Sequence, residues 1–177
     1  MRGLLLLSDP QHAQMRPECW LAEARKLNME IQYDETAACK GPPLLSALQL
    51  KFQRLRRRCE WVCVMAEGDM AAHGLILAAQ LPVDRLILLG GSVLRKRHAD
   101  RRQRRLNAFA RRNLSLITAE ILAAGMDTRC LRRLSSSLGY HCAGLICTED
   151  AAELWQKRES FLTAPFDALV EQAEYGK

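Results

Sequence analysis

Polar side chains that could bind or act on a ligand stand directly after the short apolar runs of this sequence. Carboxylates can serve as bases or nucleophiles, and glycines let backbone N–H groups approach a ligand closely. If the apolar runs are parallel strands, these side chains meet at one edge of the sheet, where open α/β folds bind their ligands. The candidate groups are Ser8-Asp9, Asp34-Glu35, Ala66–Met70, Gly90–Ser92, Gly125–Asp127 and Thr148–Asp150.

A second candidate is the basic run from Arg95 to Arg112, which holds nine lysines or arginines and the single acid Asp100. Its net charge of +8 exceeds the +6 of the whole chain, so the remaining residues carry about −2. Such a segment must lie at the surface and meet water or an anionic partner. A helix from about Asp100 would place a narrow apolar stripe containing Phe109 against the protein, and we expect this ring to pack inward.

The elements that must position these residues alternate along the chain. Short apolar runs predict strands, and apolar residues at three- and four-residue spacing predict helices between them. This alternation is typical of a three-layer α/β sandwich with a mostly parallel sheet of about six strands, and we expect residues 1–177 to form a single domain. The predicted strands are Leu4–Leu7, Met29–Tyr33, Trp61–Met65, Leu86–Leu89, Leu116–Leu122 and Ala143–Cys147, and the predicted helices are Pro17–Leu27, Leu44–Leu55, His73–Gln80 and Glu153–Leu162.

Composition agrees with a folded soluble protein, because 49% of the residues are hydrophobic and 26% are charged. The opening MRGLLLLSDP is too short for a signal peptide, and charges interrupt every long apolar run, so we expect a cytoplasmic protein without membrane contact. The seven cysteines include no Cys-x-x-Cys pair, which favours reduced thiols over disulfides or a zinc site. We expect no metal and no cofactor.

The order of the segments resembles the α/β-hydrolase family from Gly3 to about Asp150. The family's first core strand, oxyanion loop, Trp-containing helix and second strand resemble LLLLSDPQHAQMRPECWLAEARKLNMEIQYDE. Its nucleophile strand, elbow, helix and following strand resemble WVCVMAEGDMAAHGLILAAQLPVDRLILL, including a Pro-x-Asp-Arg approach from Pro82 to Leu86. Its acid-bearing strand resembles ITAEILAAGMDT. The resemblance implies a compact α/β-hydrolase-like domain with no large cap.

The elbow departs from the family pattern, which reads small-x-nucleophile-x-small on a strained turn. If Ala66 is the first small residue, Gly68 occupies the nucleophile position and offers no side chain. If the pattern is shifted by one, Asp69 takes that position, as in the dehalogenase and epoxide-hydrolase branches, but Glu67 then stands where a small residue belongs. Met70 completes the segment, and both registers remain open.

The other expected catalytic groups also depart from the family. Ser8-Asp9 replaces the usual His-Gly of the oxyanion loop, and a carboxylate there opposes the negative charge of an acyl-transfer transition state unless it is turned away. No histidine follows the last strand, so His12, in the loop after the first strand, is the candidate base. The resemblance places the triad acid on Asp127, which is alternatively the N-cap of a helix from Thr128.

These departures predict a divergent hydrolase-like protein, without standard serine-hydrolase activity, that binds an anionic small molecule. In the family arrangement the basic run overhangs the crevice and gives it an anion-attracting rim. One alternative is an active hydrolase that uses Asp69, Asp127 and His12. Another is binding of nucleic acid or another polyanion through Arg95–Arg112, which an inward-packed Phe109 would disfavour, and an oligomer contact is a further reading. The rim candidates are Arg97, Arg101, Arg104 and Arg105.

Overall fold

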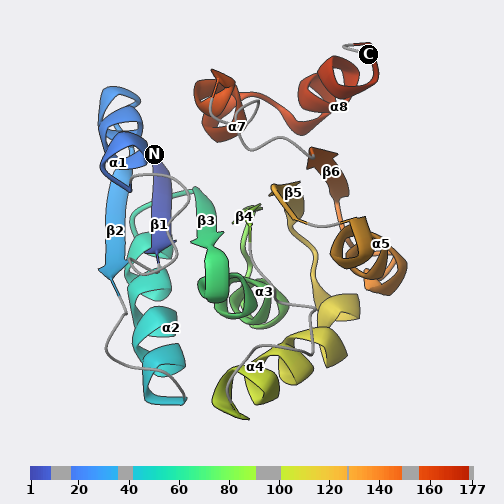
Figure 1. Cartoon of the computed structure of the whole chain (residues 1–177). Helices are drawn as coiled ribbons and strands as arrows, with labels where there is room; N and C mark the ends of the chain where they lie inside the picture. Colours follow the sequence, from blue (N-terminus) through green and yellow to red (C-terminus); the bar gives the residue numbers. More distant parts are fainter. Residues whose placement is uncertain (9–16, 36–41, 91–100, 127, 149–155, 176–177) are drawn as a thin grey trace.

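The computed structural model describes residues 1–8, 17–35, 42–90, 101–126, 128–148 and 156–175. Six strands form one sheet in which every neighbouring pair is parallel, in the order β2-β1-β3-β4-β5-β6 (Figure 1). The predicted three-layer sandwich with a parallel sheet of six strands is therefore confirmed. The strands are β1 (Arg2–Ser8), β2 (Glu30–Glu35), β3 (Trp61–Glu67), β4 (Arg85–Leu89), β5 (Glu120–Ala124) and β6 (Gly144–Thr148).

Helices cover both faces of this sheet, and each face has its own apolar core. The first core includes side chains from α2 (Pro42–Arg56), α3 (Ala71–Gln80), α4 (Arg101–Arg112) and α5 (Thr128–Ser137). The second includes side chains from α1 (Pro17–Lys26), α7 (Arg158–Thr163) and α8 (Phe166–Tyr175). Strands buried on both faces read as continuous apolar runs, which explains why the central strands β1, β3 and β4 could be recognised from the sequence alone.

Two of the predicted strands and helices differ from the structure by more than two residues at one limit. The strand expected at Leu116–Leu122 is β5 at Glu120–Ala124, preceded by a 3₁₀ turn, η2 (Leu114–Leu116). The error arose because Leu116 extends the apolar run although its side chain is 59% exposed. The helix expected at Glu153–Leu162 is described as α7, from Arg158 to Thr163, and residues 149–155 lie outside the described part of the chain.

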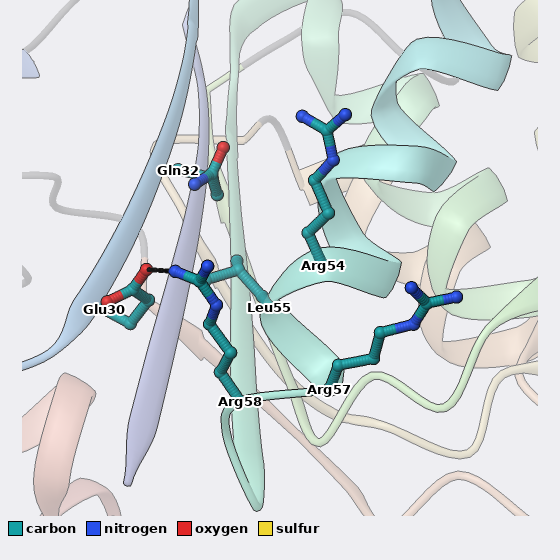
Figure 2. Close-up of a pocket in the computed structure, with 6 residues that line it drawn as sticks. All are labelled: Glu30, Gln32, Arg54, Leu55, Arg57 and Arg58. Carbon is teal, nitrogen blue, oxygen red and sulfur yellow. Dashed lines mark hydrogen bonds and ion pairs between the residues drawn. The ribbon is translucent and has the colours of Figure 1, made fainter.

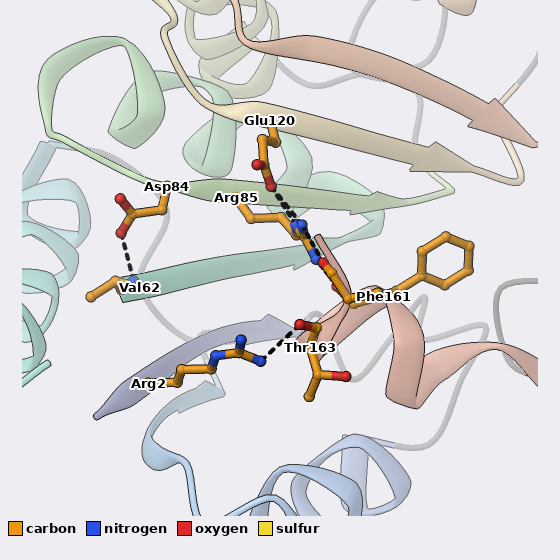
Figure 3. A network of polar contacts seen from close by, with 8 residues as sticks. Arg2, Val62, Asp84, Arg85, Glu120, Phe161 and Thr163 are labelled. Atoms are coloured by element: carbon orange, nitrogen blue, oxygen red, sulfur yellow. Dashed lines mark hydrogen bonds and ion pairs between the residues drawn. The ribbon is translucent and has the colours of Figure 1, made fainter. Parts of the chain in front are cut away.

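A buried arginine joins the sheet to the C-terminal helices at the amino ends of the strands. Arg85, at the start of β4, is only 2% exposed. Its Nε donates to Glu120 Oε2 at 2.7 Å, its Nη1 donates to the Phe161 carbonyl at 2.8 Å, and its Nη2 donates to the Ala164 carbonyl at 2.9 Å (Figure 3). A charge taken out of water is tolerated only with such partners.

The neighbouring residues extend this cluster across the sheet. The Trp61 ring lies between two guanidinium groups, with the Cζ atoms of Arg85 and Arg2 at 5.3 and 5.5 Å from its centroid, within the range of cation–π attraction. Asp84 Oδ2 accepts the Val62 backbone N–H at 2.7 Å, which ties the starts of β3 and β4 together (Figure 3). Asp84 and Arg85, at the start of β4, therefore stabilise the amino edge of the sheet.

Replacing this arginine should destabilise the protein strongly. We expect Arg85→Ala to lower the free energy of unfolding by about 3–5 kcal/mol, because it leaves the Glu120 carboxylate and the backbone carbonyls of Phe161 and Ala164 without their hydrogen-bond donor. Urea denaturation followed by circular dichroism measures the change. The matched control is Arg58→Ala, which removes the exposed ion pair between Arg58 Nη1 and Glu30 Oε1 at 3.0 Å and should cost less than about 1 kcal/mol. Equal losses for the two variants would contradict this role for Arg85.

The reactivity of the Cys63 thiol, in the middle of β3, measures opening of the same sheet. Burial raises the pKa of Cys63 to about 12, and only the thiolate reacts with alkylating reagents. We therefore expect iodoacetamide at pH 8 to modify the exposed Cys147 in the native protein and to reach Cys63 only after denaturation. Peptide mass spectrometry at increasing urea concentration measures both sites. Native-state labelling of Cys63 as fast as that of Cys147 would contradict the packing described.

Candidate functional site

A sharp turn joins β3 to α3 at the carboxyl edge of the sheet. Glu67, the last residue of β3, has extended backbone angles, and Gly68 follows with φ of 58°. Gly68–Met70 then form a 3₁₀ turn, η1, that continues directly into α3. A strand that ends in a left-handed residue and enters a helix is the backbone of a nucleophile elbow. The left-handed position favours glycine, since any Cβ there costs about 1–2 kcal/mol.

The close approach of α3 to β3 holds this turn in place. A Cβ atom on Gly74 would lie 2.7 Å from Ala66 Cβ, a separation that real atoms do not adopt without a shift. The helix can therefore cross the strand at this distance only because Ala66 and Gly74 are small. Of the two registers left open by the sequence, this backbone corresponds to the one with Ala66 two residues before the turn and Gly68 at its apex.

Two buried polar side chains face one another beside the apex. Ser8 ends β1, Glu67 ends the adjacent strand β3, and both are buried. The Ser8 hydroxyl donates to Glu67 Oε2 at 3.4 Å, a long hydrogen bond. The sequence pattern marked Glu67 only as a residue too large for its elbow position. The parallel register that brings two strand ends together is the signal that could have paired it with Ser8.

The remaining predicted catalytic residues are only partly described. Asp69 lies one residue past the apex, in η1, and is partly exposed. His73 lies one turn further along α3 and is buried. Asp9, His12 and Asp127 lie outside the described residues, so their expected roles stay predictions. The side chains that the structure brings to the elbow are those of Ser8 and Glu67.

Left-handed glycines also mark the ends of the next two strands. Gly90 follows β4 with φ of 62°, and Gly125 follows β5 with φ of 65°. The Gly90 backbone N–H donates to the Ala124 carbonyl at 2.7 Å, so the two turns are linked. Because β3, β4 and β5 are neighbours, glycine turns end three adjacent strands at the same edge. Their backbones could approach a ligand without interference from side chains.

The described part of the basic run, Arg101–Arg112, forms α4, which packs beside α3 on one face of the sheet (Figure 1). Ala110 is buried, while Arg101, Arg104 and Arg105 are exposed, as the helical spacing predicted, and Asn107 is buried as well. The expected inward packing of Phe109 is wrong. Its ring is 44% exposed, because the buried side of α4 is centred on Asn107 and Ala110, two and one residues away from it. Arg97 lies outside the described residues.

A groove with a volume of about 390 Å³ lies away from the elbow, between the edge strand β2 and the end of α2 (Figure 2). Within it the Glu30 carboxylate accepts from Arg58 Nη1 at 3.0 Å. Glu30 is the first residue of β2, so the groove begins at the amino end of that strand, opposite to the edge where parallel sheets bind ligands. The groove is lined by Glu30, Gln32, Arg54, Leu55, Arg57 and Arg58.

The described part of the chain lacks two further features. No group of three or more histidine, cysteine, aspartate or glutamate side chains there has the arrangement needed to hold a metal ion. None of the helices in this part is long and apolar enough to cross a membrane.

Several solved structures that superpose on this chain are described as hydrolases. No protein-family model matches this sequence, and no curated protein matches it. An esterase from Pyrococcus furiosus superposes with a TM-score of 0.61 at 6% identity, over 98% of this chain and 82% of its own. One of two metagenome-derived lipolytic enzymes, LipS and LipT, gives 0.60 at 9% identity over 98% and 91%.

A protein described as a proposed hydrolase of the α/β superfamily, from Xanthomonas campestris, superposes with a TM-score of 0.58 at 10% identity. The match covers 97% of this chain and 98% of that one. At such low identity, structural likeness speaks for the fold and not for the activity. The strand order, the elbow between β3 and α3 and these matches together show that this chain has the α/β-hydrolase fold.

Proposed function

We propose that this protein is a divergent member of the α/β-hydrolase fold that binds an anionic small molecule at the carboxyl edge of its sheet and does not perform serine-hydrolase chemistry. The observation that carries the proposal is the glycine at the apex of the elbow. In a serine hydrolase the apex side chain attacks the substrate. Gly68 keeps the backbone of that turn and has no atom with which to attack.

The surroundings of the apex support the same conclusion. An oxyanion hole places hydrogen-bond donors where negative charge develops. Here the described neighbour of the apex is the buried carboxylate of Glu67, which would oppose such charge. Attraction of an anionic ligand is instead proposed to come from the basic run, whose Arg101, Arg104 and Arg105 side chains are exposed. In the sequence the run follows the turn at Gly90.

The proposal predicts an absence of serine-hydrolase reactivity. We expect no turnover of p-nitrophenyl acetate above the rate given by a heat-denatured sample, and no covalent labelling by a fluorophosphonate, since there is no activated hydroxyl at the apex. Intact-protein mass spectrometry detects a single adduct. Stoichiometric labelling of the folded protein, mapped to Ser8 or any other hydroxyl, would overturn the proposal.

A second candidate is a hydrolase that uses an aspartate, and the two acidic side chains beside the apex favour it. Glu67 precedes Gly68 and Asp69 follows it, so a carboxylate flanks the turn on each side. If Asp69 is the nucleophile or the base, a panel of alkyl halides and epoxides should contain a substrate, and Asp69→Asn should reduce its turnover by at least about 100-fold. The proposal without catalysis predicts that Asp69→Asn changes nothing measurable on this panel.

A further inference from the structure

Two helices that are separated in sequence combine their arginines on one face of the molecule. Helices α4 and α5 both pack on the face of the sheet that carries α3, and the turn η2 contacts both of them (Figure 1). Neither helix contains an aspartate or a glutamate. The basic surface is therefore larger than the run that the sequence marks. Its exposed arginines are Arg101, Arg104, Arg105 and Arg112 on α4, and Arg129, Arg132 and Arg133 on α5.

Most of these arginines form no ion pair within the described part of the protein. Some arginines elsewhere have clear partners, such as Glu120 for Arg85 and Glu30 for Arg58. Six arginines of α4 and α5 form no ion pair with another described residue. They are Arg101, Arg104, Arg105, Arg112, Arg129 and Arg132. Guanidinium groups that form no ion pair with a described residue raise the local potential and suit an anionic partner.

Large apolar side chains stand exposed among these arginines. Phe109 lies on α4 and is 44% exposed, Leu116 ends η2, and Tyr140, just after α5, is fully exposed. The segment that carries Tyr140 is held against η2, because a Cβ atom on Gly139 would lie 2.4 Å from the Ser115 carbonyl oxygen. The residue that carries this exposed aromatic ring thus follows directly on a segment that lies against the turn contacting both basic helices.

Arginines together with exposed aromatic rings match the chemistry of unpaired nucleotides. Guanidinium groups bind phosphates, and the faces of aromatic rings stack on bases that are free of a partner strand. A duplex hides its base faces, so exposed rings add nothing to its recognition there. A sulfated polysaccharide or an anionic membrane would use the arginines and would have no base to stack on Tyr140.

We propose that the surface formed by α4, η2, α5 and Tyr140, here named the α4–α5 surface, binds single-stranded nucleic acid. The exposed arginines neutralise successive phosphates, and Tyr140 and Phe109 stack on bases. This surface shares Arg101, Arg104 and Arg105 with the anion-attracting rim proposed above, but none of its residues lies in the elbow itself.

The test measures fluorescence anisotropy of a labelled oligouridylate of about 16 nucleotides, the upper end of common site sizes, over a range of salt concentrations. We expect the logarithm of the affinity to fall linearly with the logarithm of salt, by about 0.7 for each phosphate neutralised. The variant Arg104→Ala/Arg105→Ala/Arg132→Ala should weaken binding and flatten this slope by about 2.

Stacking is separated from charge by a second variant. Tyr140→Ala should weaken binding by about 5- to 150-fold, the loss expected for one stacked base, and leave the salt slope unchanged. Because Tyr140 is fully exposed, the variant should fold normally, which circular dichroism checks. The matched control is Arg54→Ala/Arg57→Ala, which removes two exposed arginines at the opposite edge of the sheet, beside β2, and should change the affinity by less than about twofold.

Three results would overturn the proposal. The first is absence of binding at low salt. The second is an unchanged affinity for Tyr140→Ala together with equal competition by heparin, which would indicate a surface that attracts any polyanion. The third is tighter binding to a duplex of the same length or to vesicles containing phosphatidylserine than to the oligouridylate.

Discussion

The architecture depends most on the hydrogen bonds and the ion pair that the buried Arg85 guanidinium forms. Glu120 from the next strand and two carbonyls from the C-terminal region converge on it, so one side chain joins β4, β5 and α7. A parallel sheet needs cover on both faces, and the second face is partly closed by residues that follow the last strand. Without partners from that region, a buried charge at the start of β4 would be strongly unfavourable.

This cluster lies at the amino ends of the strands, whereas the elbow lies at their carboxyl ends. The separation means that the polar groups that hold the domain together are distinct from those available for ligands. At the carboxyl edge the structure keeps the costly parts of a hydrolase elbow, namely the left-handed apex at Gly68 and the tight crossing at Ala66 and Gly74. The turn is retained because α3 packs closely against β3. That packing requires small residues at the crossing and does not require a nucleophile.

The two proposed binding regions both draw on arginine and differ in what accompanies it. Near the elbow, the proposed small ligand would meet glycine turns and the buried carboxylate of Glu67, and the arginines would only attract it. Across α4 and α5 the arginines are spread over two helices and stand among exposed rings, which favours an extended chain. Surface charge of this kind steers association and leaves the fold itself unaffected.

The sequence by itself determined the sandwich of helices and parallel strands, because strands buried on both faces must be apolar and alternate with helices. It also located the candidate turn at Ala66–Met70, and it left two registers open there. Only the tertiary structure decided that Gly68 is the apex, since a left-handed backbone is a property of the folded turn. The exposure of Phe109 and the addition of α5 to the basic surface likewise came from packing. Spacing along one helix defines its faces, but the neighbouring elements decide which of those faces meets water.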